Sequence, residues 1–146
     1  MLEDFSGLWA QVRVEVARRG LPSDFQKPDW RGDHLQFAGV PSFARYSILI
    51  RRSSWYVELG FECKDRRRKE MALARIQGDI ERLEEITGER LVVESNPRSR
   101  RGRVRTSLYS DRNPAAMVGK LARLRAALDP MLQELAARSG LEPETS

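Results

Sequence analysis

The chain has 146 residues, 32% of them charged, and a formal net charge of +5 at pH 7. This length suits one domain with its own core, and no apolar run is long enough to cross a bilayer. One cysteine and one histidine cannot form an intramolecular disulfide or a structural zinc site from the usual soft ligands. Because the acidic first residues do not resemble a secretory signal either, we expect a cytoplasmic protein.

The N-terminal residues 2–19 predict an amphipathic helix that ends at Gly20, because apolar side chains recur at helical spacing. Those side chains are Phe5, Leu8, Trp9, Val12 and Val16. Residues 20–33 contain two prolines and Gly32, which is typical of an irregular loop. A short strand is expected at residues 34–40.

The clearest pattern is a β-hairpin of residues 44–52 and 55–64, in which large apolar side chains occupy alternate positions. If Ser53 and Ser54 form the loop, one face of the pair is apolar and the other is polar. The predicted pairs are Ile50 with Val57, Ile48 with Leu59 and Tyr46 with Phe61 on the core face, and Arg51 with Tyr56 and Arg45 with Glu62 on the other face.

The second half of the chain predicts a helix over residues 65–88, strands over residues 91–94 and 103–109, and a terminal helix. Leu108 is expected to point inward from the last strand. Asn113 and Pro114 suit the N-cap and first turn of the terminal helix. Pro130 is expected to kink or restart that helix. Its expected buried side chains are Met117, Leu121, Leu124, Leu128, Met131 and Leu135.

Together these elements predict an α+β fold in the order α-β-β-β-α-β-β-α, with a mostly antiparallel sheet of four to five strands packed against helices. We expect one domain over residues 1–140 and a frayed tail at residues 141–146. The face of the sheet without helices would carry Arg45, Arg51, Tyr56, Glu58, Glu62, Lys64, Arg103 and Arg105.

Between Arg90 and Arg112 lie seven arginines but only two acidic residues, Glu94 and Asp111. The surplus of five positive charges in this segment equals the net charge of the whole chain. Arginines at alternate strand positions share a face, and such a stripe attracts nucleic acid. The competing interpretation is a solvated strand face. The predicted nucleic-acid contacts are Arg98, Arg100, Arg101, Arg103, Arg105, Arg51, Arg45 and Tyr56, with Tyr109 and Trp30 as further candidates for base stacking.

A metal-dependent nuclease is the main alternative. Glu62 and Lys64 share one strand face and match the Glu-x-Lys half of a restriction-endonuclease-like site, in which a carboxylate holds Mg²⁺ or Mn²⁺. Such a site needs a second carboxylate, for which Glu58 or Asp33 would be a displaced substitute. The ordinary interpretation pairs Glu62 with Arg45, and it assigns His34 and Cys63 structural roles.

A broader likeness covers residues 43–137. Residues 56–59 (Tyr-Val-Glu-Leu) on a strand precede a helix with Ile80-Glu81, then Gly88, Leu91, the basic strand of residues 103–105 and a leucine-rich helix. This order resembles an uncharacterised bacterial domain that is often appended to restriction-endonuclease-like modules. The resemblance implies a role beside DNA-processing or phage-defence enzymes, without an active site of its own.

The preferred hypothesis is therefore a small cytoplasmic module, not an enzyme, that binds nucleic acid through a basic strand and loop and needs no cofactor. The alternatives are the nuclease, with Glu58, Glu62 and Lys64 as catalytic residues, and a protein-interaction or inhibitor module with a basic docking surface. A protein partner in a DNA-processing or defence complex and a homodimer are both compatible with the sequence. No contact with a membrane is expected.

Overall fold

The computed structural model describes residues 6–20, 29–31, 34–38, 44–51, 53–63, 65–96 and 98–138. The elements follow one another as α1 (Ser6–Arg18), β1 (Asp29–Arg31), β2 (His34–Ala38), β3 (Ala44–Ile50), β4 (Trp55–Glu62), α2 (Arg66–Gly78), α3 (Ile80–Thr87), β5 (Leu91–Ser95), β6 (Arg101–Thr106) and α4 (Pro114–Arg138).

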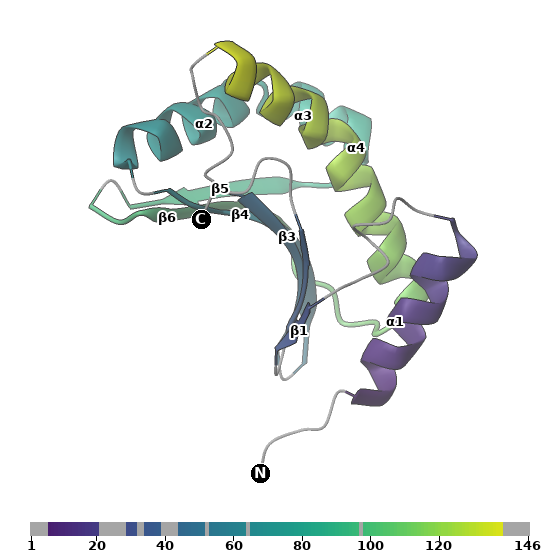
Figure 1. Ribbon diagram of the computed structural model, residues 1–146. Helices are drawn as coiled ribbons and strands as arrows, with labels where there is room; N and C mark the ends of the chain where they lie inside the picture. The colour runs from purple at the N-terminus through teal and green to yellow at the C-terminus, as the bar shows by residue number, and fades with distance from the viewer. Residues whose placement is uncertain are drawn as a thin grey trace.

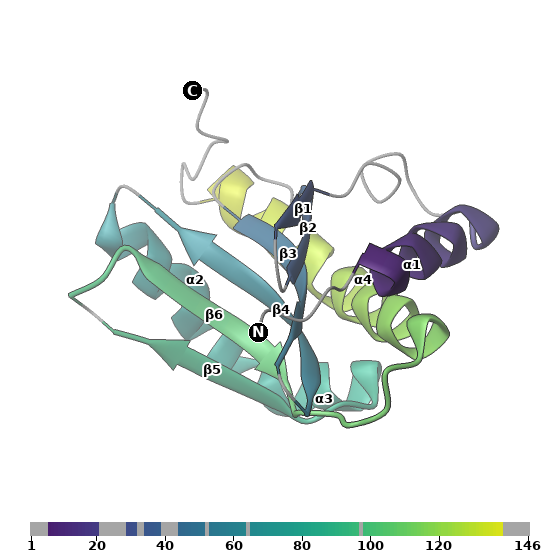
Figure 2. The ribbon, with the colours of Figure 1, turned by 90° about the horizontal axis from the view of Figure 1, so that it is seen from below.

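The described strands form one six-stranded sheet in the order β1-β2-β3-β4-β6-β5, and every neighbouring pair is antiparallel. The sheet is strongly curved, and the four helices lie on its convex side (Figure 1). No helix of the described part covers the concave side, which faces the viewer in Figure 2. The predicted α+β class is confirmed, although β1 lies within residues that were predicted to be a loop.

The central hairpin of β3 and β4 has the predicted faces but a different register. Ile50 pairs with Trp55, and the Arg51 N–H donates to the Ser54 carbonyl (2.7 Å), so the turn closes between Arg51 and Ser54. The register predicted from a Ser53-Ser54 loop is therefore wrong by two residues. A shift of two leaves every side chain on its predicted face. The alternate positions Tyr46, Ile48, Ile50, Trp55, Val57, Leu59 and Phe61 are all buried.

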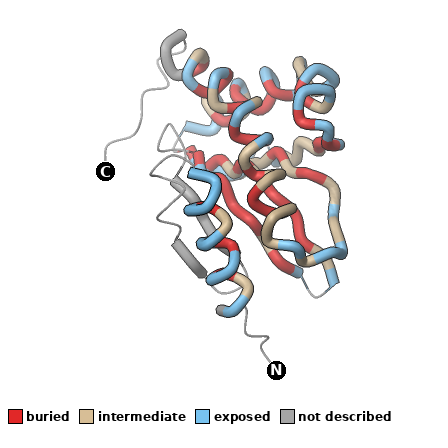
Figure 3. Tube along the Cα trace, turned by 90° about the vertical axis from the view of Figure 1, so that its right-hand side faces the viewer, coloured by how far each residue is buried: buried red, intermediate tan, exposed pale blue. Residues whose placement is uncertain are grey.

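The hydrophobic core lies between the convex face and the helices, where Figure 3 shows the buried positions. Helix α1 buries Trp9, Val12 and Val16, as predicted, and Gly20 follows it with a left-handed φ of 62°. The predicted inner face of α4 is also buried, from Met117 to Leu135. Residues 1–5 and the predicted tail lie outside the described residues.

The helix predicted over residues 65–88 is two helices, because Asp79 leaves the helical conformation with φ −107° and ψ 14°. The Asp79 N–H donates to the Ile76 carbonyl and ends α2, while the Asp79 carbonyl accepts from Leu83 N–H and begins α3. Glycine before aspartate is a weak helical pair.

Helix α4 begins as predicted, with the Asn113 side chain accepting from the backbone N–H of Ala115 (2.9 Å). It continues through Pro130 as one helix, so the predicted restart does not occur. Leu108, expected to point inward, is 57% exposed because β6 ends at Thr106. Among the described residues, no helix is long and apolar enough to cross a membrane.

Close packing of α2 on β6 depends on Gly102, which sits on the convex side of its strand. A Cβ at this position would lie 2.3 Å from Leu73 Cδ1 and 3.2 Å from Lys69 Cδ. We expect Gly102→Ala to lower the free energy of unfolding by about 1–3 kcal/mol, since Leu73 is buried and must be displaced. Urea denaturation measures this change. Gly78→Ala is the matched control, because a Cβ there meets no atom within 4 Å, and an equal loss in both variants would contradict the explanation.

Candidate nucleic-acid interface

The three arginines of β6 project from the concave face, as predicted, but each is opposite a glutamate on a neighbouring strand. In the register, Glu62 of β4 faces Arg101, Glu94 of β5 faces Arg103, and Glu58 of β4 faces Arg105. Cross-strand pairs of opposite charge stabilise a sheet. We call these residues the charge-paired strip: Arg101, Arg103, Arg105, Glu58, Glu62 and Glu94.

Glu94 is the centre of the charge-paired strip. Its Oε1 accepts from Arg105 Nε (2.5 Å) and its Oε2 from Arg103 Nη2 (3.1 Å). Arg103 Nη1 also lies 3.5 Å from a Glu58 carboxylate oxygen. With three guanidinium groups facing three carboxylates, the strand part of the site is charge-balanced. The predicted stripe of arginines on one face of β6 is present, and glutamates of β4 and β5 oppose it.

Tyr56 lies beneath these arginines and is only 3% exposed. The guanidinium carbons of Arg51, Arg103 and Arg105 lie 5.9, 5.3 and 5.8 Å from the centre of its ring. Its hydroxyl oxygen accepts from Arg103 (2.8 Å) and Arg51 (3.2 Å). Arg51 therefore lies beside Tyr56 as predicted, although the register partner of Tyr56 is Leu49. Because arginines cover the ring, the expectation that Tyr56 offers a stacking surface to a base is wrong.

The contacts of the charge-paired strip also shift pKa values. The hydrogen bond from Arg105 is the main cause of a lowered pKa at Glu94, with partial burial opposing it and Arg103 adding to it. Burial alone would lower the pKa of Arg103. Hydrogen bonds with Tyr56 and Glu94 outweigh burial and raise that pKa. Both groups are therefore held in their charged forms.

A second group of arginines lies where α2 begins beside the loop between β5 and β6. Arg66 Nη1 donates to the backbone carbonyl of Arg98 (3.1 Å), which joins the two segments. We call this group the basic tip: Arg66, Arg67, Arg68, Arg98, Arg100 and Arg101. All are exposed except Arg68, which is half-buried.

The arginines of the basic tip are weakly opposed by acidic groups. Arg68 lies 3.9 Å from Asp65 and Arg101 lies 3.8 Å from Glu62, and both contacts are open to solvent. Within the part of the chain that the structure describes, no carboxylate lies within ion-pair distance of the other four members. Those members are Arg66, Arg67, Arg98 and Arg100. The sequence prediction included the loop arginines but missed residues 66–68, although Arg66-Arg-Arg-Lys69 is a conspicuous basic run.

The shape of the loop depends on Lys69, whose side chain is completely buried on α2. Its ammonium group donates to the carbonyls of Asn96 and Ser99 (2.7 Å each) and Arg101 (3.4 Å). The ammonium group is also paired with Glu70 at 2.7 Å. Side chains complete the turn, since the Asn96 Oδ1 accepts from the Arg98 N–H and the Ser99 Oγ accepts from the Arg101 N–H (3.0 Å each).

The remaining predicted contact, Arg45, lies exposed on the concave side of β3, where its register partner is Gly60 and not Glu62. Of the nuclease candidates, Glu58 and Glu62 are each near an arginine of β6. Lys64 and Asp33 lie outside the described residues. Within the described ranges, no group of three or more His, Cys, Asp or Glu side chains could hold a metal ion. Cys63 is buried, as expected, and the side chain of His34 is outside the described part.

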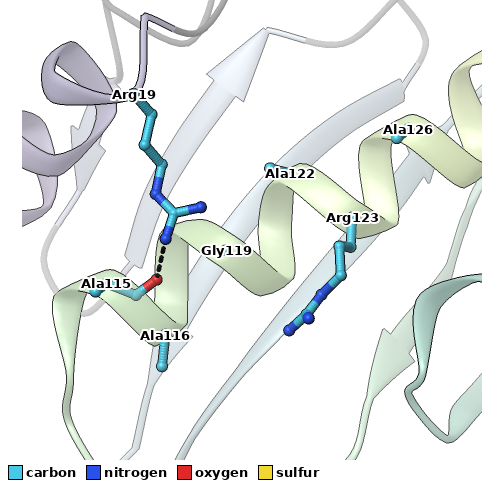
Figure 4. Close-up of a pocket in the computed structure, with 7 residues that line it drawn as sticks. All are labelled: Arg19, Ala115, Ala116, Gly119, Ala122, Arg123 and Ala126. Carbon is cyan, nitrogen blue, oxygen red and sulfur yellow. Dashed lines mark hydrogen bonds between the residues drawn. The ribbon is translucent and has the colours of Figure 1, made fainter.

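A separate hollow of about 530 Å³ lies on the helical side, between the end of α1 and α4 (Figure 4). Its lining residues are Arg19, Ala115, Ala116, Gly119, Ala122, Arg123 and Ala126. Both arginines already have partners, because Arg19 donates to the Ala115 carbonyl and contacts Glu15 while Arg123 contacts Glu89. The small apolar floor offers no group for chemistry.

Comparisons of the chain with protein-family models, with curated proteins and with solved structures found no match. The candidate interface therefore rests on the geometry of the basic tip and the charge-paired strip.

We expect Lys69→Met to loosen the loop, because methionine fills the space of the stem but leaves the Asn96 and Ser99 carbonyls without a donor. Losing such buried partners costs about 1–3 kcal/mol. Hydrogen exchange at the amides of Ser99 and Arg101 should accelerate more than exchange in β4. Lys120→Met removes another lysine–glutamate pair and should leave the loop unchanged. Equal exchange in the two variants would contradict a role of Lys69 in shaping the loop.

The lowered pKa of Glu94 predicts a pH-dependent contribution to stability. A carboxyl group whose folded pKa lies below its ordinary value of 4.5 stabilises the fold above that pH. Its contribution is lost as the pH falls through the folded pKa. The wild-type melting temperature should therefore decrease more steeply below pH 4.5 than that of Glu94→Gln, in thermal scans followed by circular dichroism. Parallel curves would contradict the assigned ion pairs.

Proposed function

We propose that this chain is a small module that binds nucleic acid through the basic tip. The single observation that supports this most is the meeting of two arginine-rich segments, residues 66–68 and 98–101, at one end of the molecule. Four of these side chains are exposed and have no carboxylate partner among the described residues. A surface of this kind attracts the dense negative charge of a phosphate backbone.

Arginine suits this role better than lysine, because its planar guanidinium group can donate two parallel hydrogen bonds to one phosphate. The backbone of the tip is fixed by Lys69 and the Asn96 and Ser99 side chains. A fixed loop loses less conformational entropy on binding than a flexible one. Exposed guanidinium groups readily contact phosphates, and phosphate contacts give little sequence selectivity.

The order of elements that resembles a domain appended to restriction-endonuclease-like modules supports a more specific context. We propose a role as an accessory to DNA-processing or phage-defence machinery in the cytoplasm. In that context a sequence-indifferent anchor holds the nucleic acid while a partner protein performs the chemistry. An acidic protein surface could occupy the same tip, so the binding experiment must distinguish the two ligands.

The test replaces Arg98, Arg100 and Arg101 by alanine and measures the affinity for duplex DNA, single-stranded DNA and RNA of equal length at several salt concentrations. We expect a roughly tenfold or greater loss of affinity at low salt, with a plot of log K against log salt that is shallower by about two to three. Magnesium is present in a parallel series, in which cleavage products are monitored.

The matched control replaces three exposed arginines outside the tip, Arg13, Arg82 and Arg123, and so changes the net charge equally. If both triple variants lose affinity to the same degree, net charge and not the tip is responsible. If the wild-type protein binds no nucleic acid at low salt, the proposal is wrong. Recovery of an acidic protein partner would then favour docking to protein.

A further inference from the structure

The charge-paired strip continues the line of the basic tip along the concave face. Arg101 belongs to both, and Arg103 and Arg105 follow at alternate positions of β6, about 6.7 Å apart along a strand. Their side chains are 31% and 22% exposed, against 78% for Arg101. A nucleic-acid strand that is bound at the tip would therefore reach these two arginines next, but Glu94 already occupies them.

We propose that Glu94 is an internal anion that competes with the phosphate backbone for Arg103 and Arg105. This inference rests on the function proposed above. Glu94 places one carboxylate oxygen on each arginine, at 2.5 Å from Arg105 Nε and 3.1 Å from Arg103 Nη2. An oxyanion of a phosphate makes the same kind of charge-assisted hydrogen bond. In the unbound protein the two strand arginines are thus held in position and neutralised.

The place of Glu94 in the fold makes it the carboxylate that a ligand can displace. It belongs to β5, the edge strand of the sheet, and its side chain is 40% exposed. Glu58, which also faces Arg103, belongs to the central strand β4 and is 14% exposed. Rotating an edge carboxylate into water exposes its charge to solvent, whereas Glu58 would have to be displaced within the sheet. A bound strand therefore replaces Glu94 and leaves Glu58 in place.

Displacement of Glu94 requires a ligand with several linked phosphates. A free anion at the tip has no means of reaching Arg103 or Arg105 at high effective concentration, while a strand anchored at the tip presents its next phosphates to them directly. Glu94 therefore restricts the strand arginines to extended polyanions and makes the tip the first point of contact.

The experiment compares Glu94→Gln with the wild-type protein in binding single-stranded and duplex oligonucleotides. Glutamine keeps the size of the side chain and can still accept a hydrogen bond, but it lacks the charge. We expect the affinity to rise about three- to tenfold. The matched control is Glu85→Gln on the exposed side of α3, which removes the same charge outside the charge-paired strip and should change the affinity less than twofold.

Two further variants assign the gain to the named arginines. When Arg103 and Arg105 are both alanine, Glu94→Gln should no longer increase the affinity. The inference is overturned if Glu94→Gln gains no more than Glu85→Gln, or if its gain persists without the two arginines. Thermal unfolding of each variant shows that the fold is retained.

A measurement on the wild-type protein does not depend on any variant. The ¹⁵N resonances of the Arg103 and Arg105 side chains should shift when an oligonucleotide saturates the protein, and not with inorganic phosphate. Unchanged Nε resonances at saturation overturn the inference while leaving a tip-bound ligand intact. If neither the wild type nor Glu94→Gln binds nucleic acid, the proposed function and this inference are both wrong.

Discussion

One buried ammonium group holds together the end of this protein that carries the basic tip. Lys69 reaches from α2 into the loop between β5 and β6, where its ammonium group meets the carbonyls of Asn96, Ser99 and, at a longer distance, Arg101. The Glu70 carboxylate is its fourth neighbour. A buried charge is tolerated only when it is fully hydrogen-bonded, so the loop must take the shape that satisfies Lys69. The start of α2 and the loop between β5 and β6 consequently behave as one unit, and their arginines share one surface.

Arginines have different surroundings in the basic tip and along β6. In the tip, four arginines have no carboxylate partner in the described part, whereas the arginines of β6 have glutamates across from them in the register. The net charge read from the sequence does not distinguish these two groups of arginines. Cross-strand neighbours, and not the number of arginines, decide which guanidinium groups are available to a ligand.

Period-two and period-3.6 patterns were sufficient to predict the sheet faces and most of the helices from the sequence. A register shift of two preserves those faces, which explains why the β3–β4 register was wrong while the core residues were right. The sequence shows Glu94 as one of two acidic residues between Arg90 and Arg112. Its position beside Arg103 and Arg105 depends on β6 inserting between β4 and β5. The contact of Arg66 with Arg98 joins residues 32 positions apart, and no local pattern encodes it.

The burial of Tyr56 limits what this surface can recognise. Three arginines surround its ring, so the concave face presents guanidinium edges where an exposed aromatic ring would allow bases to stack. Guanidinium groups contact the phosphates of a nucleic acid whatever its base sequence. Under the proposed function, selectivity for a particular nucleic acid would have to come from elsewhere, either from the spacing of phosphates along β6 or from a protein that acts beside this one. A module that anchors without reading sequence fits an accessory role better than an independent regulator of chosen sites.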